Sequence, residues 1–92
     1  MNLLWTEGAW ADYVFWQEND RDLLRRINNL IREIERSPFG GIGKPEPLGG
    51  DFAGWWSRRI NREHRIVYRV TGSARDQRLE IAACRFHYSR RR

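Results

Sequence analysis

The sequence predicts a small single α+β domain: a βαα arrangement, then an antiparallel β-meander, with the two helices packed on one face of the sheet. Apolar residues recur at helical spacing before residue 37, and from residue 54 onward the pattern changes to the two-residue alternation of strands. The chain has 92 residues, the size of one domain (1–92). Such a domain has a small core, so a functional site must lie on or near its surface.

The first half of the chain reads as one strand and two helices. Residues 2–5, NLLW, are short and apolar and form the predicted first strand. Thr6 can cap the first helix, in which helical spacing is shown by Trp10, Tyr13, Val14 and Gln17. Asp20 can cap the second helix, which ends near Ser37-Pro38. Its apolar positions are Leu23, Ile27, Leu30, Ile31 and Ile34.

A loop of 13 residues, PFGGIGKPEPLGG (38–50), separates the helices from the later strands. It holds all three prolines and five of the eight glycines, and loops of this length within a compact domain are often functional. Glu46 stands between Pro45 and Pro47, which fix two φ angles and push the residues before them towards extended geometry. The sequence therefore predicts that this glutamate is held in place.

Three segments after the loop are predicted as strands: 54–60, 65–70 and 79–84. Turns at 61–64 and 71–77 connect them. In RIVYRV (65–70) the apolar even-numbered residues share one face, and the other face carries Arg65, Val67 and Arg69. We expect the helices to cover the apolar face and the arginines to lie on the other.

Basic residues are concentrated in the second half of the chain. Residues 1–50 carry 6 Lys/Arg and 8 Asp/Glu, a net charge of −2, and residues 51–92 carry 11 and 4, a net charge of +7. A basic half in a small domain indicates a polyanionic partner, most simply nucleic acid, although a merely solvating surface has the same composition.

The cellular compartment is predicted from the cysteine content and from the absence of targeting and membrane segments. Cys84 is the single cysteine, which excludes an internal disulfide, and its apolar surroundings predict a small buried side chain. No signal peptide or membrane span is apparent, so we expect a cytoplasmic protein without membrane contact.

Most kinds of catalytic site find no support in the sequence. No Cys/His group has metal-ligand spacing, and acidic residues do not gather as in a two-metal nuclease. No Walker glycine motif and no serine nucleophile with its base are present. We therefore expect no metal and no cofactor. Metal-free cleavage of RNA remains, because its 2′-OH is an internal nucleophile; the reaction needs a base, an acid and cations for the phosphate.

Three residues match those needs. Glu46 is the candidate base, because a catalytic group must be held firmly. His87 is the candidate acid, because histidine changes charge near neutral pH. Arg65 is the candidate phosphate clamp, because a guanidinium presents a planar fork of donors. Each residue also has an ordinary interpretation, as an exposed loop carboxylate, a terminal histidine or a solvated arginine.

Further residues are candidates for contact with RNA or the ribosome. Arg58 and Arg59 are two, but alternation along a strand puts them on opposite faces, so only one can line the site. Lys44 and Arg85 are further basic candidates. Tyr88 could stack on a base or, alternatively, close the core. Structural roles are predicted for Trp55, Trp56 and His64.

Four blocks of the sequence together resemble a known family. They are WTEGAWADYVFWQENDR (5–21), SPFGGIGKPEPL (37–48), FAGWWSRRINREHRIVYRV (52–70) and IAACRFHY (81–88). The chain resembles, over almost its whole length, the YoeB toxins of bacterial toxin–antitoxin pairs, within the RelE-like mRNA interferases. The resemblance implies a RelE-like fold of the microbial-ribonuclease kind. It also implies a metal-independent endoribonuclease that cleaves mRNA in the ribosomal A site and so inhibits translation.

The resemblance also implies roles and partners. The glutamate of KPEPL, Glu46, is then the general base, and Arg65 of EHR supports the phosphate. His87 is the general acid and Tyr88 shapes the RNA site. The family further implies a homodimer, and a small YefM-type antitoxin whose extended tail covers the site.

The sequence departs from the family pattern in three places. Gly49 and Gly50 follow PEPL, where relatives often carry a basic residue, and the turn at 71–77 is longer than usual. A basic tail (89–92) follows Tyr88, and it could add contacts to ribosomal RNA or crowd the tyrosine. Strict alternation would place His87 and Tyr88 on opposite faces, so the strand must end or twist there if both are to reach RNA.

Two other classes of function stay open on the residues alone. A non-catalytic basic nucleic-acid-binding module, or a corepressor acting with a partner protein, would need the arginines but not Glu46. A plain interaction protein would bind RNA with little dependence on salt, whereas phosphate contacts weaken steeply as salt rises.

Overall fold

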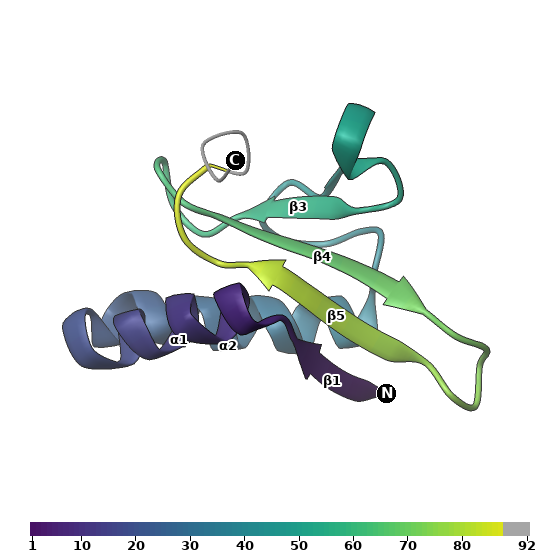
Figure 1. The fold of residues 1–92 in the computed structure, drawn as a ribbon, viewed down its shortest axis with the longest axis horizontal. Coiled ribbons are helices and arrows are strands. Elements are labelled where there is room, and N and C mark those ends of the chain that lie inside the picture. Colours follow the sequence, from purple (N-terminus) through teal and green to yellow (C-terminus); the bar gives the residue numbers. More distant parts are fainter. Residues whose placement is uncertain (88–92) are drawn as a thin grey trace.

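A computed structural model describes residues 1–87 and shows two layers, a sheet and a pair of helices on one of its faces (Figure 1). The helices are α1 (Glu7–Asn19) and α2 (Arg21–Arg36). The strands are β1 (Asn2–Trp5), β2 (Glu46–Pro47), β3 (Trp56–Arg59), β4 (Arg65–Thr71) and β5 (Arg78–Ala83), and a short 3-10 helix, η1 (Gly50–Phe52), precedes β3. The predicted α+β fold is confirmed. Within the described residues, neither helix is long and apolar enough to cross a membrane.

The five strands form one mixed sheet in the order β1-β5-β4-β3-β2. β3, β4 and β5 make the predicted antiparallel meander, and β1 pairs in parallel with β5 at one edge. β2 was predicted only as part of a loop. It is a two-residue strand at the opposite edge, antiparallel to β3, and too short to give an alternation signal in the sequence.

Both predicted helix caps are present. The Thr6 side chain accepts a hydrogen bond from the Ala9 amide, and the Asp20 side chain accepts one from the Leu23 amide at 3.1 Å. The α2 residues that pack in the core are the predicted Ile27, Leu30, Ile31 and Ile34.

The packed face of α1 differs from the predicted spacing. Its buried residues are Ala9, Asp12 and Trp16, whereas Trp10 is 51% exposed. Aromatic residues occur all around this helix, so no single apolar stripe identifies the packed side. The Trp10 ring instead stacks on Tyr13 at the surface, with 5.8 Å between centroids.

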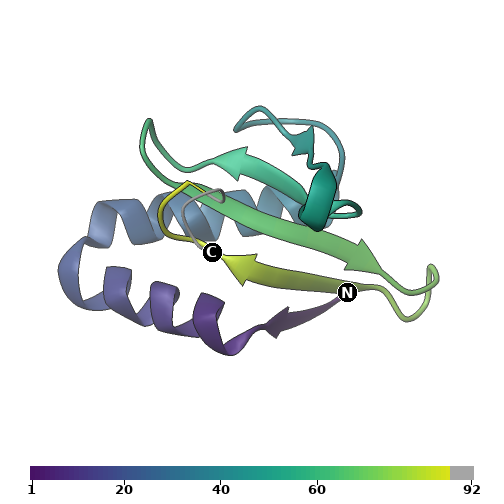
Figure 2. The same ribbon diagram turned by 45° about the horizontal axis from the view of Figure 1, so that its top comes forward.

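The helices cover one face of the sheet, and we call the other the open face. The main core lies between the helices and the covered face, which contributes Ile66, Tyr68 and Ile81. On the open face, a smaller apolar cluster contains Leu48, Val67 and Ala83, with Phe52, Trp55 and Ala82 partly buried against it. Figure 2 shows the sheet partly from its open face, with α2 behind it.

Arg58 lies on the covered face and is fully buried. Its Nε donates to the Tyr68 hydroxyl at 3.1 Å, and its terminal nitrogens donate to the Ile42 and Ser37 carbonyls at 3.0 and 2.6 Å. The guanidinium therefore ties the 37–42 loop to the core. The prediction that Arg58 contacts RNA is wrong for this fold, because alternation along β3 turns its side chain inward and Arg59 outward.

Arg58→Ala should strongly destabilise the protein. The substitution removes the hydrogen bond to the buried Tyr68 hydroxyl and opens a cavity, and each effect costs about 1–3 kcal/mol. The melting temperature should fall by at least ~10 °C, since 1 kcal/mol shifts it by roughly 4–8 °C in a domain of this size. Thermal unfolding followed by circular dichroism checks this, with the exposed neighbour Arg59→Ala as the matched control. Equal melting temperatures for the two variants would contradict the structural role of Arg58.

Candidate functional site

The open face brings together the residues predicted for RNA chemistry. Glu46 is the register partner of Ser57, and Arg59 is the register partner of Arg65. Register partners point to the same face of a sheet, so these four side chains share the open face with Val67, the partner of Ser57. From sheet spacings, the Cα atoms of Glu46 and Arg59 lie ~7–8 Å apart and those of Glu46 and Arg65 ~12 Å apart. Long side chains can close both distances around one phosphate group.

The segment GKPEPL (43–48) is fixed along the edge of β3. The Gly43 carbonyl accepts from the Arg59 amide at 2.7 Å, and the Leu48 amide donates to the Trp55 carbonyl at 2.8 Å. Glu46 and Leu48 are two residues apart, so their backbone groups face β3, and the prolines occupy the positions that face away from the sheet. A proline in a strand is tolerated at such positions, because its missing N–H has no partner there.

A left-handed turn leads into this segment. Gly43 and Lys44 have φ values of 85° and 52°. A Cβ at Gly43 would lie only 3.0 Å from Leu30 and 3.1 Å from the Cβ of Arg58, so the positive φ and the crowding both favour glycine at this position. Lys44 is exposed, two residues before Glu46. Its contact with RNA stays a prediction.

Arg65 is held at the start of β4 by the turn that precedes it. Its Nη1 donates to the Asn61 carbonyl at 3.2 Å. The Asn61 side chain in turn accepts from the Glu63 and His64 amides at 2.9 and 2.8 Å, which fixes the turn itself. Among residues 1–87, the guanidinium forms no salt bridge, so its remaining donors are available to a phosphate.

The positive charge of the open face is uneven. At the far end of β4, Arg69 pairs with Glu80 at 2.9 Å and lies over the Trp55 ring, 4.3 Å from its centroid. Hydrogen bonds from Thr71 and then from Arg69 lower the pKa of Glu80, so this carboxylate stays ionised and cancels the charge of Arg69. Within the described part, no carboxylate pairs in this way with Arg59 or Arg65. The end that holds Glu46 therefore keeps its positive charge.

The segment that carries His87 leaves the sheet just before the site. Register between β4 and β5 shifts at Val67/Tyr68, so that Ala82 is an extra residue in β5, and the strand ends at Ala83. The Cys84 amide donates to the buried Asp12 carboxylate at 3.0 Å, and the Cys84 carbonyl accepts from Trp16 Nε1 at 2.8 Å. As predicted, the Cys84 side chain is fully buried.

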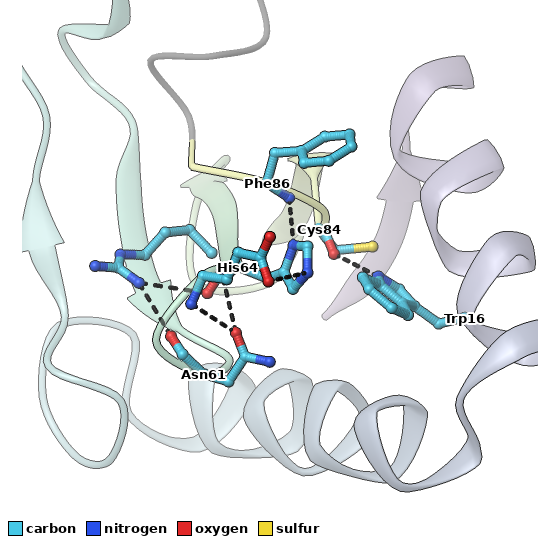
Figure 3. Close-up of polar contacts among 7 residues, drawn as sticks. Trp16, Asn61, His64, Cys84 and Phe86 are labelled. Atoms are coloured by element: carbon cyan, nitrogen blue, oxygen red, sulfur yellow. Dashed lines mark hydrogen bonds and ion pairs between the residues drawn. The ribbon is translucent and has the colours of Figure 1, made fainter.

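Two residues later the chain is attached to the start of β4. The Phe86 amide donates to His64 Nδ1 at 2.7 Å, and the Phe86 carbonyl accepts from the Arg65 amide at 3.0 Å. Figure 3 shows the His64 ring between Trp16 and Phe86, close to the turn at Asn61. Phe86 has a φ of 64°, a left-handed value that is uncommon for a bulky residue. His87 follows directly, so the candidate acid is connected to the strand that carries Arg65.

The remaining predicted residues lie as follows. Arg85 packs between two rings, with its guanidinium carbon 3.5 Å from the Phe15 centroid and 4.5 Å from that of Phe86. This contact holds the segment against α1, and an RNA contact of Arg85 stays a prediction. Tyr88 and the basic tail (89–92) lie outside the described residues. Within residues 1–87, no group of three or more His, Cys, Asp or Glu side chains could hold a metal ion.

Sequence reasoning missed the residues that hold the C-terminal segment. Asp12 and Trp16 are one helical turn apart on α1, and both bind the backbone of Cys84. An acidic residue flanked by aromatic residues in a predicted helix was the available signal, but its partner lies 72 residues away in the sequence. His64 was correctly expected to be structural. The hydrogen bond that its ring accepts from the Phe86 amide could not be predicted from the sequence of the turn.

Comparison with known proteins shows the family of the chain. The sequence model of the family described as "YoeB-like toxin of bacterial type II toxin-antitoxin system" matches residues 5–88. The Toxin YoeB of Escherichia coli K12 is 53% identical over 88 residues, which cover 96% of this chain and 100% of that protein. The Toxin YoeB of Synechocystis sp. PCC 6803 is 54% identical over 90 residues, covering 98% and 100%.

Solved structures extend the likeness to the fold. A YoeB/ParE toxin from Agrobacterium tumefaciens superposes with a TM-score of 0.94 and 60% identity, over 96% of this chain and 100% of that one. The Staphylococcus aureus toxin in a heterotetrameric YoeB–YefM complex gives a TM-score of 0.84 and 40% identity, over 96% and 98%. A YafQ mutant from E. coli, at 17% identity and a TM-score of 0.70, shares the fold. This chain therefore belongs to the family of YoeB-like toxins of bacterial type II toxin–antitoxin systems.

Proposed function

We propose that this toxin is an endoribonuclease that cleaves mRNA in the ribosomal A site by metal-independent acid–base catalysis and so inhibits translation. The observation that carries the proposal is the open face, where Glu46, Arg59 and Arg65 lie in adjoining register positions. We assign His87 to the same site as its fourth member; support comes from the preceding Phe86, which is hydrogen-bonded to both His64 and Arg65.

The proposed reaction uses the 2′-OH of the RNA as nucleophile. The Glu46 carboxylate removes the 2′ proton, and the 2′ oxygen attacks the adjacent phosphorus. The bond from phosphorus to the 5′ oxygen of the next nucleotide breaks, and His87 donates a proton to that oxygen. The products are a 2′,3′-cyclic phosphate and a 5′-hydroxyl. Arg65, with Arg59 beside it, stabilises the negative charge that grows on the phosphate oxygens.

The geometry suits a ligand that lies across the strands. Glu46 is exposed on the edge strand β2, whereas Arg65 is half-buried at the start of β4. A phosphodiester that lies across β3 would contact the base, Glu46, on one side and the phosphate clamp, Arg65, on the other. Tyr88 is proposed to shape the RNA site, and Lys44 to contact the phosphate backbone.

Relatives indicate the partners. A Staphylococcus aureus YoeB was solved as a dimer, and others from that species as YoeB–YefM complexes. We extend both associations to this chain: a homodimer, and a YefM-type antitoxin that covers the open face.

Glu46→Gln and His87→Gln should each lower mRNA cleavage by about 10²–10⁴-fold, the usual loss when a general acid or base is removed. Glu46→Gln keeps the shape of the side chain but cannot accept the 2′ proton. Cleavage of a defined mRNA in programmed ribosomes, resolved on a sequencing gel, measures the loss. The matched control is Glu35→Gln, an exposed glutamate on α2 in the helical layer.

Undiminished cutting by both site variants would contradict the assignment. Translation inhibition without cutting, equally strong in Glu46→Gln, would instead favour a non-catalytic RNA-binding module that acts by occupancy. The assay therefore separates an endoribonuclease from a non-catalytic RNA-binding module.

Gly49→Lys should strengthen binding to the ribosome and to RNA. Gly49 is exposed and has an ordinary φ of −117°, and a Cβ added there would have no neighbouring atom within 4 Å. A lysine therefore fits at the position where relatives often carry a basic residue. One added phosphate contact should steepen the plot of log K against log salt by ~0.7–0.9. Filter binding at several salt concentrations measures the slope, with Gly49→Gln as the neutral control. An unchanged slope would show that this position does not face the phosphate backbone.

A further inference from the structure

The segment 84–87 carries the candidate acid but lies outside the sheet. β5 ends at Ala83, so ladder hydrogen bonds no longer fix the chain beyond it. We propose that His64 is a positioning residue: its neutral imidazole accepts the Phe86 amide hydrogen and thereby holds His87 beside Arg65. This inference rests on the proposed function for the role of His87, but the hydrogen bond itself can be tested without any cleavage.

Both backbone groups of Phe86 are bound by two adjacent residues. The amide donates to His64 Nδ1 at 2.7 Å, and the carbonyl accepts from the Arg65 amide at 3.0 Å. We call this pair of bonds the Phe86 clamp. It acts on a residue with a φ of 64°, a conformation that a phenylalanine keeps only when its surroundings determine it. Since His87 is the next residue, the clamp fixes where the backbone of the candidate acid begins.

The His64 ring is itself held in place. It is buried, with 7% of the residue exposed, and packs edge-on against Trp16 with 4.7 Å between ring centroids. The His64 amide donates to the Asn61 side chain, so the turn also fixes its backbone. Nδ1 is therefore aimed at the Phe86 amide by packing on one side and by the turn on the other (Figure 3).

The clamp requires one protonation state of the ring. Nδ1 can accept a hydrogen only when it carries a lone pair, so the proton must sit on Nε2, which lies 3.7 Å from a Glu63 carboxylate oxygen. An imidazolium would set two N–H groups against each other. Protonation of His64 therefore opens the clamp.

The charges around His64 decide when that happens. Burial is the largest influence and lowers the pKa of His64. Glu63 from the turn and Asp12 from α1 act in the opposite direction, and Arg85 from the C-terminal segment adds to the lowering. The ring is thus neutral and the clamp closed at neutral pH, and the clamp opens only as the pH falls below the ordinary range for histidine.

The same shift predicts how stability depends on pH. The unfolded chain takes up a proton on His64 near pH ~6.5, whereas the folded chain resists it, so the unfolded state binds more protons in that interval. Folding stability due to His64 is complete above pH ~6.5 and declines as the pH falls towards the folded-state pKa. The fall in melting temperature between pH 7.5 and 5.5 should therefore be smaller in His64→Gln than in the original protein. Identical falls would show that His64 protonates equally in both states.

Nuclear magnetic resonance tests the clamp directly, on the full chain made in the Glu46→Gln background. At pH 7.5, the Nδ1 nitrogen of His64 should have the shift of an unprotonated ring nitrogen, and the Phe86 amide should be protected from hydrogen exchange. On acidification, that protection should vanish with the midpoint of the His64 titration. The Cys84 amide, which Asp12 holds, is the internal control and should keep its protection. A proton on Nδ1 at pH 7.5, or Phe86 exchange independent of His64, would overturn the proposal.

Two substitutions then test the positioning role in ribosome cleavage. His64→Phe fills the ring site without an acceptor and should lower the single-turnover rate by ~10–100-fold, as misplacement of a catalytic group does, with binding nearly unchanged. His64→Gln offers an amide oxygen to the Phe86 amide, so it should recover most of the rate and lose less activity at acidic pH. Equal rates for the original protein and His64→Phe would refute the role. If the original protein cuts no mRNA, the proposed function fails, and the exchange data still decide on the clamp.

Discussion

The alternation of side chains along β4 is the constraint on which both layers of the molecule depend. Ile66 and Tyr68 point into the core beneath the helices, whereas Arg65 and Val67 point to the open face. β4 lies at the centre of the sheet order, so a slip of one residue would move the arginine into the core and an isoleucine to the surface. Core packing therefore also sets which side chains lie on the open face.

The two candidate proton-transfer residues are held by different physical means. Glu46 is held by nearby parts of the chain. Its proline neighbours restrict its backbone, and it pairs with β3, the next strand in the sequence. His87 is held from a distance, through hydrogen bonds that α1 and the start of β4 make to the two residues Cys84 and Phe86. The first arrangement can be recognised in the six-residue segment GKPEPL (43–48). The second depends on hydrogen bonds between residues that are far apart in the sequence, so it is seen only in the folded chain.

This difference explains what the sequence could predict. The helices, the meander and the open face follow from periodicity, and the Glu46 segment follows from its prolines. The parallel pairing of β1 with β5 could not be read from any local pattern, because its partners are 76 residues apart. The same holds for the attachment of Cys84 by Asp12 and Trp16. Arg58 was the one basic candidate that proved buried, and alternation allowed either it or its neighbour to face inward.

The pairing of β1 with β5 has a consequence for the timing of assembly. Ribosomes make a chain from its N-terminus, so β1 and α1 emerge long before their neighbour β5 exists, and closing so long a loop is slow. Asp12 and Trp16 likewise form their hydrogen bonds to Cys84 only after that residue has been synthesised. The edge of the sheet that β1 forms is thus completed only after β5 has been synthesised.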